Sequence, residues 1–348
     1  MERIIDLRSD TITQPTPQMR QAMAEAIIGD DLHGEDPTTK RLEEMSAERM
    51  GKEAALFVAS GTMGNLLAFL VLCHPGSELI MEANSYTYWS EAGSWARFGG
   101  LQARLLKGNQ GLPSLVDIQA AIRPKDLFEP PTGAYCLENP HNWAGGVIVS
   151  IEQTQAIADL LNQHHVPLYI DGARIFNAAV ASGRAASNFA APAEAIMFSI
   201  SKGLCCPVGA VIAGSASFIE QARFIRQALG GGMAMPGILA AAGIVALETM
   251  IDRLAEDHAN ARLLAEEIIK LGSPLRIDMS IVQTNMVFVD ISAYPPGRTW
   301  LLDQLAQQGV QCWGILDKWI RFVTHYGIVE EDIQHTVRVI REVLRLRP

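Results

Sequence analysis

Short apolar runs alternate with helical segments along the chain as far as residue 214, and this alternation is the feature that most limits the fold. Each run has the length of one β-strand, and the segments between the runs carry apolar residues at helical spacing. Strands that alternate with helices form a mainly parallel sheet with helices packed on its faces. The sequence therefore predicts an α/β fold with strands at 78–82, 101–106, 134–139, 168–171, 195–201 and 210–214.

Two of these strands are followed by groups of opposite charge. The run 168–171 ends in Asp171, and the run 195–201 is followed by Lys202. Ligands of parallel sheets lie outside the carboxyl ends of the strands, so both side chains should face one crevice. A partly desolvated lysine forms a Schiff base with an aldehyde. A carboxylate on a pyridinium nitrogen and a lysine on the aldehyde carbon are what pyridoxal 5′-phosphate (PLP) requires. The alternative interpretation is a surface lysine whose stem covers the edge of the core.

The length of the chain predicts more than one domain. A single hydrophobic core rarely organises 348 residues, so we expect a large domain with a smaller one appended. We place an N-terminal segment that contributes to the active site at 1–14, the large PLP-binding domain at 15–245 and a small α+β domain at 246–348. A long helix from Ile238 to Leu271 should link the two domains. Beyond it we expect strands at 285–291 and 319–324 and helices at 300–308 and 330–346.

The charge of the chain limits its partners to small molecules. The formal net charge is −10 and no run of Lys or Arg occurs, which argues against nucleic acid and anionic membranes. The longest apolar stretch, Gly64 to Cys73, is too short to span a bilayer, and the N-terminus has no apolar signal core. We therefore expect a cytoplasmic protein. The five cysteines have no metal-binding spacing and should be reduced; Cys205 and Cys206 either line the pocket or are small buried hydrophobes.

Three further segments have more than one interpretation. Residues Pro15 to Ile28 have the apolar spacing of a helix. The loop Gly29 to Thr38, with four carboxylates and His33, is either a solvated turn or a wall of the site. The turn Ser60-Gly61-Thr62 before a helix at 65–72 offers backbone N–H groups and a hydroxyl to a phosphate, although such turns also cap ordinary helices.

Several motifs in this order resemble the low-specificity L-threonine aldolases, which are PLP enzymes of fold type I with the aspartate aminotransferase architecture. The resemblance spans essentially the whole chain. It implies a large domain with a mainly parallel seven-stranded sheet and a small C-terminal α+β domain. The motifs are Leu7-Arg8-Ser9-Asp10-Thr11, the loop 29–38, Ser60-Gly61-Thr62-Met63, Leu137-Glu138-Asn139 with His141-Asn142, Asp171-Gly172-Ala173-Arg174, Ser201-Lys202-Gly203-Leu204 and Gly230-Gly231-Gly232-Met233.

The resemblance also implies roles for individual residues. Lys202 binds the cofactor aldehyde, and Asp171 keeps the pyridine nitrogen protonated, which lets the ring stabilise a carbanion at the substrate Cα. Arginine suits a carboxylate because its planar fork donates two parallel hydrogen bonds. The implied phosphate ligands are Gly61, Thr62 and Ser201, and the residues around the substrate carboxylate or the cofactor are Ser9, Arg174 and Arg321.

The implied reaction is the cleavage of a β-hydroxy-α-amino acid to glycine and an aldehyde. It needs a base for the β-hydroxyl proton, and His141, or a water that it holds, is the candidate because a neutral imidazole titrates near neutral pH. A histidine after a strand is also a common structural donor. Family members build each site across a dimer interface, so the resemblance further implies a homodimer or homotetramer.

Three departures from the family pattern bear on the substrate. Tyr86 takes the place of a histidine that stacks on the cofactor ring; a phenol also stacks, but it does not carry protons near neutral pH. His33, in the substrate-binding acidic loop, replaces a tyrosine. Ala234-Met235-Pro236 replaces a segment with a cation and an amide. The pocket should therefore be more apolar, and a substrate bulkier than threonine becomes plausible.

Three hypotheses about activity remain open at this stage. The first is aldol cleavage of a β-hydroxy-α-amino acid. The second is another PLP reaction at Cα or Cβ, such as racemisation, β-elimination or glycine transfer to a different aldehyde, since Asp171 and Lys202 serve all of them. The third is a protein of the same fold that binds an amino acid without turnover.

Overall fold

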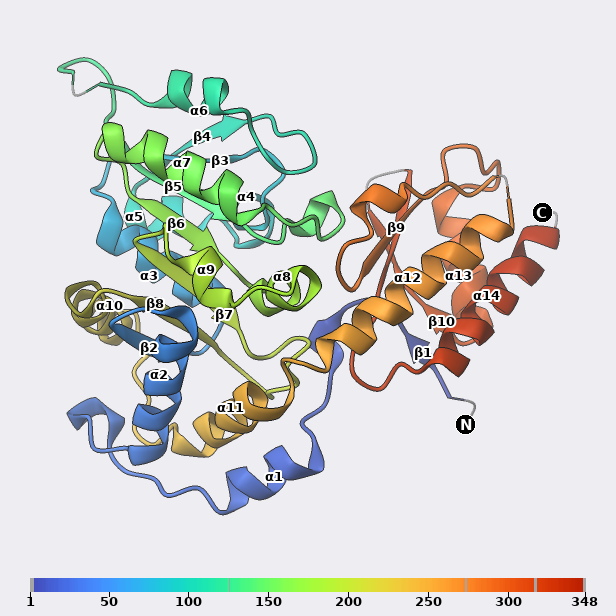
Figure 1. The fold of residues 1–348 in the computed structure, drawn as a ribbon, viewed down its shortest axis with the longest axis horizontal. Helices are drawn as coiled ribbons and strands as arrows, with labels where there is room; N and C mark the ends of the chain where they lie inside the picture. Colours follow the sequence, from blue (N-terminus) through green and yellow to red (C-terminus); the bar gives the residue numbers. More distant parts are fainter. Residues whose placement is uncertain (1–2, 125, 273, 316–317, 347–348) are drawn as a thin grey trace.

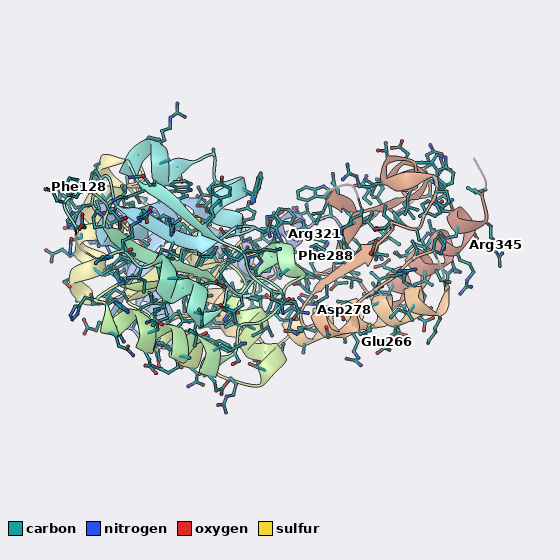
Figure 2. All side chains as sticks on the ribbon, turned by 90° about the horizontal axis from the view of Figure 1, so that it is seen from above. Phe128, Glu266, Asp278, Phe288, Arg321 and Arg345 are labelled. Atoms are coloured by element: carbon teal, nitrogen blue, oxygen red, sulfur yellow. The ribbon has the colours of Figure 1, made fainter. Side chains whose placement is uncertain are left out.

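The structure is a computed structural model that describes residues 3–124, 126–272, 274–315 and 318–346. Figure 1 shows a larger lobe, built on a seven-stranded sheet, and a smaller lobe that holds the C-terminal helices and the first strand. Seen from above, Arg321 and Phe288 of the smaller lobe lie where the two lobes meet (Figure 2). No helix among the described residues has both the length and the apolar character needed to span a membrane.

The large sheet confirms the expected mainly parallel architecture. Its strand order is β2-β8-β7-β6-β5-β3-β4. Only β8 runs antiparallel to its neighbours, β2 and β7, whereas the other neighbouring pairs are parallel. The strands are β2 (Ala54–Val58), β3 (Glu78–Glu82), β4 (Gln102–Leu106), β5 (Thr132–Glu138), β6 (Leu168–Asp171), β7 (Ala195–Ser199) and β8 (Ala210–Gly214).

Helices cover both faces of this sheet because alternate strand residues point to opposite sides. Leu56 and Ile212 pack on one face, and Phe57 and Val211 pack on the other. The first face is covered by α3 (Gly61–Leu72), α5 (Ser94–Gly99) and α10 (Ala216–Ala228). The second is covered by α2 (Pro37–Met50), α6 (Leu115–Ala121), α7 (Ile151–Gln163), α8 (Ile175–Ser182), α9 (Ala186–Ala190) and α11 (Gly237–Thr249). Helix α1 (Pro17–Ala24) packs on α11.

The smaller lobe has its own hydrophobic core between a three-stranded antiparallel sheet and three helices. The sheet order is β11-β12-β9, and Phe322 and Val289 lie in the core. Its elements are α12 (Leu254–Lys270), β9 (Met286–Asp290), α13 (Gly297–Gln307), β10 (Val310–Gln311), β11 (Trp313–Ile315), β12 (Trp319–Val323) and α14 (Glu330–Arg345).

The N-terminal segment ties the smaller lobe to the active site. Strand β1 (Ile5–Asp6) pairs in parallel with β10, and Leu7 is fully buried in the core of the smaller lobe. A few residues later, the Thr13 hydroxyl donates to the Lys202 carbonyl at 2.8 Å. The division into 1–14, 15–245 and 246–348 stays a prediction, and residue 245 falls inside α11.

Two helix predictions were wrong. The expected helix at 15–28 covers only α1, because Ile27 and Gly29 instead bond the acidic loop: Thr38 donates to the Ile27 carbonyl and Gly29 donates to Asp36. The expected helix from Ile238 to Leu271 is interrupted after Thr249 by a turn in which Leu254 N–H donates to the Ile251 carbonyl. In addition, α3 starts at Gly61 rather than 65, and β7 ends at Ser199 rather than 201.

Candidate active site

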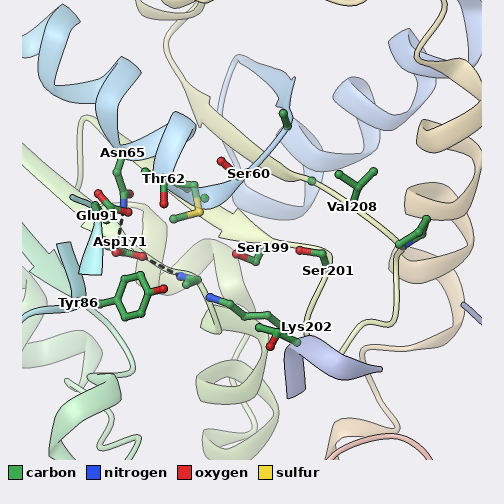
Figure 3. A pocket seen from close by; sticks show the side chains of 17 residues that line it. Ser60, Thr62, Asn65, Tyr86, Glu91, Asp171, Ser199, Ser201, Lys202 and Val208 are labelled. Carbon is green, nitrogen blue, oxygen red and sulfur yellow. Dashed lines mark hydrogen bonds between the residues drawn. The ribbon is translucent and has the colours of Figure 1, made fainter. Parts of the chain in front are cut away.

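A cavity of about 320 Å³ opens at the carboxyl ends of β6 and β7, and it brings together most of the residues predicted from the sequence. Figure 3 shows the Lys202 side chain reaching towards Asp171 beside the Tyr86 ring. The strand-end argument is therefore confirmed in its geometry. The predicted residues that line the cavity are Gly61, Thr62, Tyr86, Asp171, Ser201 and Lys202.

Lys202 lies in a tight turn after β7. Its carbonyl accepts from the Cys205 N–H at 2.9 Å, and Cys205 has a φ of 63°, a left-handed conformation that non-glycine residues seldom adopt. Burial, reinforced by the Arg174 cation, lowers the pKa of the Lys202 amine to about 8. Near neutral pH about a tenth of this amine is uncharged, far more than for an ordinary lysine, and this form attacks an aldehyde carbon.

Asp171 ends β6 and is held by three donors. One oxygen accepts from the Asn65 side-chain amide at 2.9 Å and from the Thr87 hydroxyl at 3.2 Å, and the other accepts from the Ala173 N–H at 3.2 Å. Asn65 is itself oriented by the Tyr169 hydroxyl, which donates to it at 2.7 Å. These bonds fix the direction in which the carboxylate faces the cavity, as recognition of a ring nitrogen requires.

Glu91 is a second cavity carboxyl that the sequence analysis missed. It accepts from the same Asn65 amide at 2.8 Å, and its other oxygen is buried without a hydrogen-bond partner. Burial, followed by the nearby Asp171 charge, raises the pKa of Glu91 to about 8. In the sequence, Glu91 stands out only as an acidic residue in an aromatic stretch without a neighbouring Lys or Arg. Only the fold shows that its carboxyl lies near that of Asp171, since both accept from Asn65.

The opposite end of the cavity suits a phosphate. The Ser60 hydroxyl caps α3 by accepting from the Met63 N–H at 3.2 Å, so the positive end of the α3 dipole faces the cavity. A Cβ on Gly61 would lie 3.2 Å from the Met197 methyl and 3.3 Å from the Ser199 hydroxyl. The small residue therefore keeps this end open, and the cavity as a whole fits PLP.

Arg321 supplies a buried cation beside the cavity. It is 2% exposed, and among the described residues no carboxylate lies within ion-pair distance of it. Its guanidinium donates to the Asn142 side-chain carbonyl and to the Arg8 carbonyl, both at 3.1 Å, whereas its Nε has no partner. Burial and the Arg174 charge lower its pKa to about 10. A buried cation without a counter-ion is a strong candidate for binding a carboxylate.

Arg174 and Ser9 have protein partners of their own. Arg174 makes a bidentate ion pair with buried Asp10, at 2.6 and 2.7 Å. Although burial opposes ionisation, the Arg174 guanidinium holds the pKa of Asp10 well below its usual range. The Ser9 hydroxyl accepts from the Thr11 N–H and hydroxyl, and it is Thr11, rather than Ser9, that lines the cavity. Ser9 therefore orients the turn that carries Asp10.

His141 is fully enclosed between two carboxylates. Its Nε2 lies 3.1 Å from Glu82 and 3.8 Å from Glu138, while its Nδ1 has no partner. Burial alone would lower the pKa of His141, but the charges of Glu138 and Glu82 raise it above its usual value. The sequence analysis expected a neutral imidazole near pH 7; these carboxylates shift the balance towards the charged form. His141 does not line the cavity itself.

Glu138 connects His141 to the rest of the site. One carboxyl oxygen accepts from the Tyr86 N–H at 2.7 Å and the other from the Asn142 N–H at 2.8 Å. Tyr86 begins helix α4 (Tyr86–Ser90), and its ring centre lies 5.9 Å from the Lys202 amine. Burial and the charge of Glu91 raise the pKa of the Tyr86 phenol, so it is neutral near pH 7.

The acidic loop, Gly29 to Thr38, does not line the cavity. His33 is exposed, and its Nδ1 lies 3.0 Å from the Asp30 carboxylate. Asp31 forms a buried ion pair with Arg226 at 2.9 Å, and Asp36 accepts from the Gly237 N–H at 3.0 Å. The loop is thus anchored to α10 and α11. It also bonds the segment 234–236 through the Asp31 N–H and the Ala234 carbonyl.

The cysteines behave as small buried hydrophobes. Cys205 and Cys206 are 0% and 2% exposed, and burial raises the pKa of each thiol to about 12. All five cysteines are free thiols. Among the described residues, no group of His, Cys, Asp and Glu has the arrangement of a metal site.

Comparisons with known proteins agree with this geometry. The family model for beta-eliminating lyases matches residues 6–293. The chain is 42% identical to low-specificity L-threonine aldolase 1 of Arabidopsis thaliana, over 98% of this chain and 97% of that protein. It is 39% identical to the low specificity L-threonine aldolase of Escherichia coli K12, over 83% and 85%. Among solved structures, a threonine aldolase of Leishmania major superposes with a TM-score of 0.84 at 16% identity, over 98% of this chain and 99% of the other.

Proposed function

The chain belongs to the beta-eliminating lyase family, and on that premise we propose that it is a PLP-dependent lyase that cleaves a β-hydroxy-α-amino acid to glycine and an aldehyde. The observation that carries the proposal is the cavity itself. One cavity holds a lysine amine with a lowered pKa, a fixed carboxylate and the start of a helix. These three groups match the aldehyde, the ring nitrogen and the phosphate of PLP.

Each end of the cofactor has its own protein group. When bound, PLP withdraws electrons from the substrate Cα and stabilises a carbanion there. Lys202 holds the aldehyde carbon, and Asp171 keeps the ring nitrogen protonated. Tyr86 covers one face of the ring and is near enough to Lys202 to do so. The phosphate is held by Gly61, Thr62 and Ser201, which line the cavity. Arg174 follows the cavity residue Ala173 and is fixed by Asp10, and its role is to bind the cofactor or the substrate carboxylate.

Arg321 anchors the substrate carboxylate. Its guanidinium is buried, held in place by Asn142 and the Arg8 carbonyl, and has no protein counter-ion within the described chain. A substrate carboxylate supplies the missing negative charge. Ser9 supports this binding indirectly through the turn that holds Asp10 and Arg174.

His141, with its partner Glu82, accepts the proton of the β-hydroxyl through a water, because the imidazole does not line the cavity itself. Its Nδ1 is the ring nitrogen that Glu82 leaves free. Because its pKa is raised, the imidazole becomes an effective base only above its usual titration range. Tyr86, with its raised pKa, is unsuited to this role near neutral pH.

An amino-acid panel tests the proposed activity. The purified protein, loaded with PLP, is incubated with L-threonine, L-allo-threonine and phenylserine, and glycine and aldehyde are measured. Release of both products from at least one of these substrates is expected. Formation of a 2-oxo acid (2-oxobutyrate from either threonine, phenylpyruvate from phenylserine) or of a D-amino acid, without aldehyde, would instead indicate another reaction at Cα or Cβ. Binding without any product would indicate a non-catalytic protein.

We also propose a homodimer or a homotetramer in a reducing cytoplasmic location. Apolar side chains are exposed around the acidic loop, including Ile27 at 73%, Leu32 at 49% and Met235 at 57%, and a face of this kind favours association. In such an assembly the exposed His33 would serve the partner's site. The five buried free thiols suit a reducing compartment.

A further inference from the structure

A second cavity, of about 590 Å³, lies between the two lobes next to the candidate active site. We call it the tryptophan cavity because four tryptophans line it. Its volume is within the range of small-molecule sites, and its lining is mainly apolar. The larger lobe contributes Trp89 and Trp143, and the smaller lobe contributes Ile281, Phe288, Trp313 and Trp319.

The tryptophan cavity and the PLP cavity share the segments that form their walls. Helix α4 places Tyr86 in the PLP cavity and Trp89 in the tryptophan cavity. Likewise, Asn142 accepts from Arg174 and Arg321 at the active site, and the next residue, Trp143, lines the tryptophan cavity. The two cavities are therefore neighbours.

Arg321 lies at the boundary between the two cavities. Its guanidinium carbon is 5.3 Å from the ring centre of Trp143 and 5.3 Å from that of Trp313, so both tryptophans that contact the cation also line the tryptophan cavity. Cation–π contacts of this kind hold a guanidinium in place. The Nε1 of Trp143 and the Nδ2 of Asn142 are buried without partners beside it. A substrate held by Arg321 thus has its carboxylate next to a large apolar space.

We propose that the tryptophan cavity binds the side chain of the substrate, and that the preferred substrate is a β-hydroxy-α-amino acid with an aryl or a branched alkyl group on Cβ. The proposal rests on the proposed function, because it concerns the same substrate. The methyl group of threonine would leave this space almost empty, whereas an aromatic ring would bury its surface against tryptophan and phenylalanine side chains. We expect kcat/KM to be at least about tenfold higher for phenylserine than for threonine.

A space-filling variant tests the proposal. Ile281 lines the tryptophan cavity and packs beside Gly145, three residues after Asn142, so Ile281→Trp adds an indole within the cavity. The dissociation constant of L-alanine, measured on the same variant, checks that binding of the substrate carboxylate is kept. The holoenzyme variant should lose at least about tenfold in the ratio of kcat/KM for phenylserine to that for threonine. Ala293→Trp is the matched control, because it adds the same indole at an exposed position of the smaller lobe. Its ratio should equal that of the unaltered protein.

A binding measurement separates this proposal from the proposed function. L-Phenylalanine has no β-hydroxyl and is not a substrate for aldol cleavage, so the difference between its dissociation constant and that of L-alanine, measured by calorimetry on the holoenzyme, reports on binding of the side chain. L-Phenylalanine should bind more tightly than L-alanine, and Ile281→Trp should remove the difference. If no β-hydroxy amino acid is cleaved but L-phenylalanine shows this pattern, the proposed activity fails and the side-chain site stands.

Two outcomes would overturn the proposal. One is an unchanged substrate ratio in Ile281→Trp together with equal binding of L-phenylalanine and L-alanine. The other is a change in the sedimentation coefficient of Ile281→Trp without a change in the ratio, which would assign the tryptophan cavity to a contact between subunits. Trp319→Phe and Trp319→Ala provide a second comparison, because the first keeps an aromatic wall and the second removes it.

Discussion

At the scale of the residue, the site depends on ionisation states set by burial. The pKa of the Lys202 amine, lowered to about 8, makes it the nucleophile that binds the cofactor. In the apoprotein the rate of PLP attachment should rise with pH and level off above about 8, since the uncharged amine reacts. Mixing apoprotein with PLP across a pH series and following the visible absorbance measures this rate. Free Nα-acetyl-lysine is the control, and its rate should go on rising. Lys202→Ala should lose both the visible aldimine absorbance and turnover, and a variant that keeps both would exclude Lys202.

The surroundings of Glu91 raise the pKa of its carboxyl and keep it protonated, whereas those of Lys202 lower the pKa of its amine. The pKa of Glu91 is raised to about 8 in the folded protein, so the folded state binds more protons than the unfolded state between the ordinary carboxyl range and pH 8. Stability must therefore fall as pH rises through that window. Glu91→Gln keeps the shape of the protonated carboxyl and removes its titration. Between the ordinary carboxyl range and pH 8, the free energy of unfolding of the variant should therefore rise relative to that of the unaltered apoprotein by about 1.4 kcal/mol per pH unit. Denaturant unfolding at pH 5 to 9 checks this, with exposed Glu248→Gln as the control; parallel curves would show that Glu91 is ionised.

At the scale of the element, the ends of neighbouring strands assemble the proton-transfer group. Strand β3 ends in Glu82 and β5 ends in Glu138, and both carboxylates lie within 4 Å of His141 Nε2, at 3.1 and 3.8 Å. Gly111, at a φ of 84°, lets its loop approach the imidazole, because a Cβ there would lie 2.4 Å from the ring. The strands and this loop thus enclose His141 and set its charge.

The pH dependence of turnover follows from this arrangement. His141 acts as a base only when neutral, so kcat/KM for threonine should rise with pH through the raised pKa of His141. Glu82→Gln removes a charge and a hydrogen bond that favour the imidazolium, and the acidic limb should move to lower pH. Glu78→Gln, at the start of the same strand, is the matched control. An acidic limb that stays in place in Glu82→Gln would show that His141 is not the base.

The strand ends were predictable from the sequence, whereas the tertiary neighbours were not. Asp171 and Lys202 each stand at the end of an apolar run, and the carboxyl ends of parallel strands meet at one edge of the sheet. The local pattern and the topology were therefore enough to predict that the two side chains face one cavity. The break between α11 and α12 was missed because apolar residues continue through Met250 and Ile251. Glu91 was missed because its pKa depends on Asp171, which no local spacing relates to it.

At the scale of the whole molecule, the active site needs both lobes. Arg321 comes from β12 of the smaller lobe, and Asp171 comes from the large sheet. Asn142 joins the two by accepting from Arg321 at 3.1 Å and from Arg174 at 3.4 Å. No periodicity connects residues so distant in sequence, and Arg321 was identified only through the family resemblance. His33 does not line the cavity of its own chain, so we ask whether it serves the site of a second subunit.

Complementation between two variants tests whether His33 serves the partner's site. If each site takes Lys202 from one subunit and His33 from the other, a dimer of one Lys202→Ala chain and one His33→Ala chain has one intact site and one doubly altered site. After denaturation and refolding of an equimolar mixture, half of the dimers are hybrids in a symmetric assembly, so about a quarter of the native activity should return. A mixture no more active than the average of its two variants, with hybrids confirmed by mass spectrometry, would place His33 outside the partner's site. Lys202→Ala mixed with exposed Glu248→Ala is the control, because its hybrids keep one native site whether or not the sites are shared.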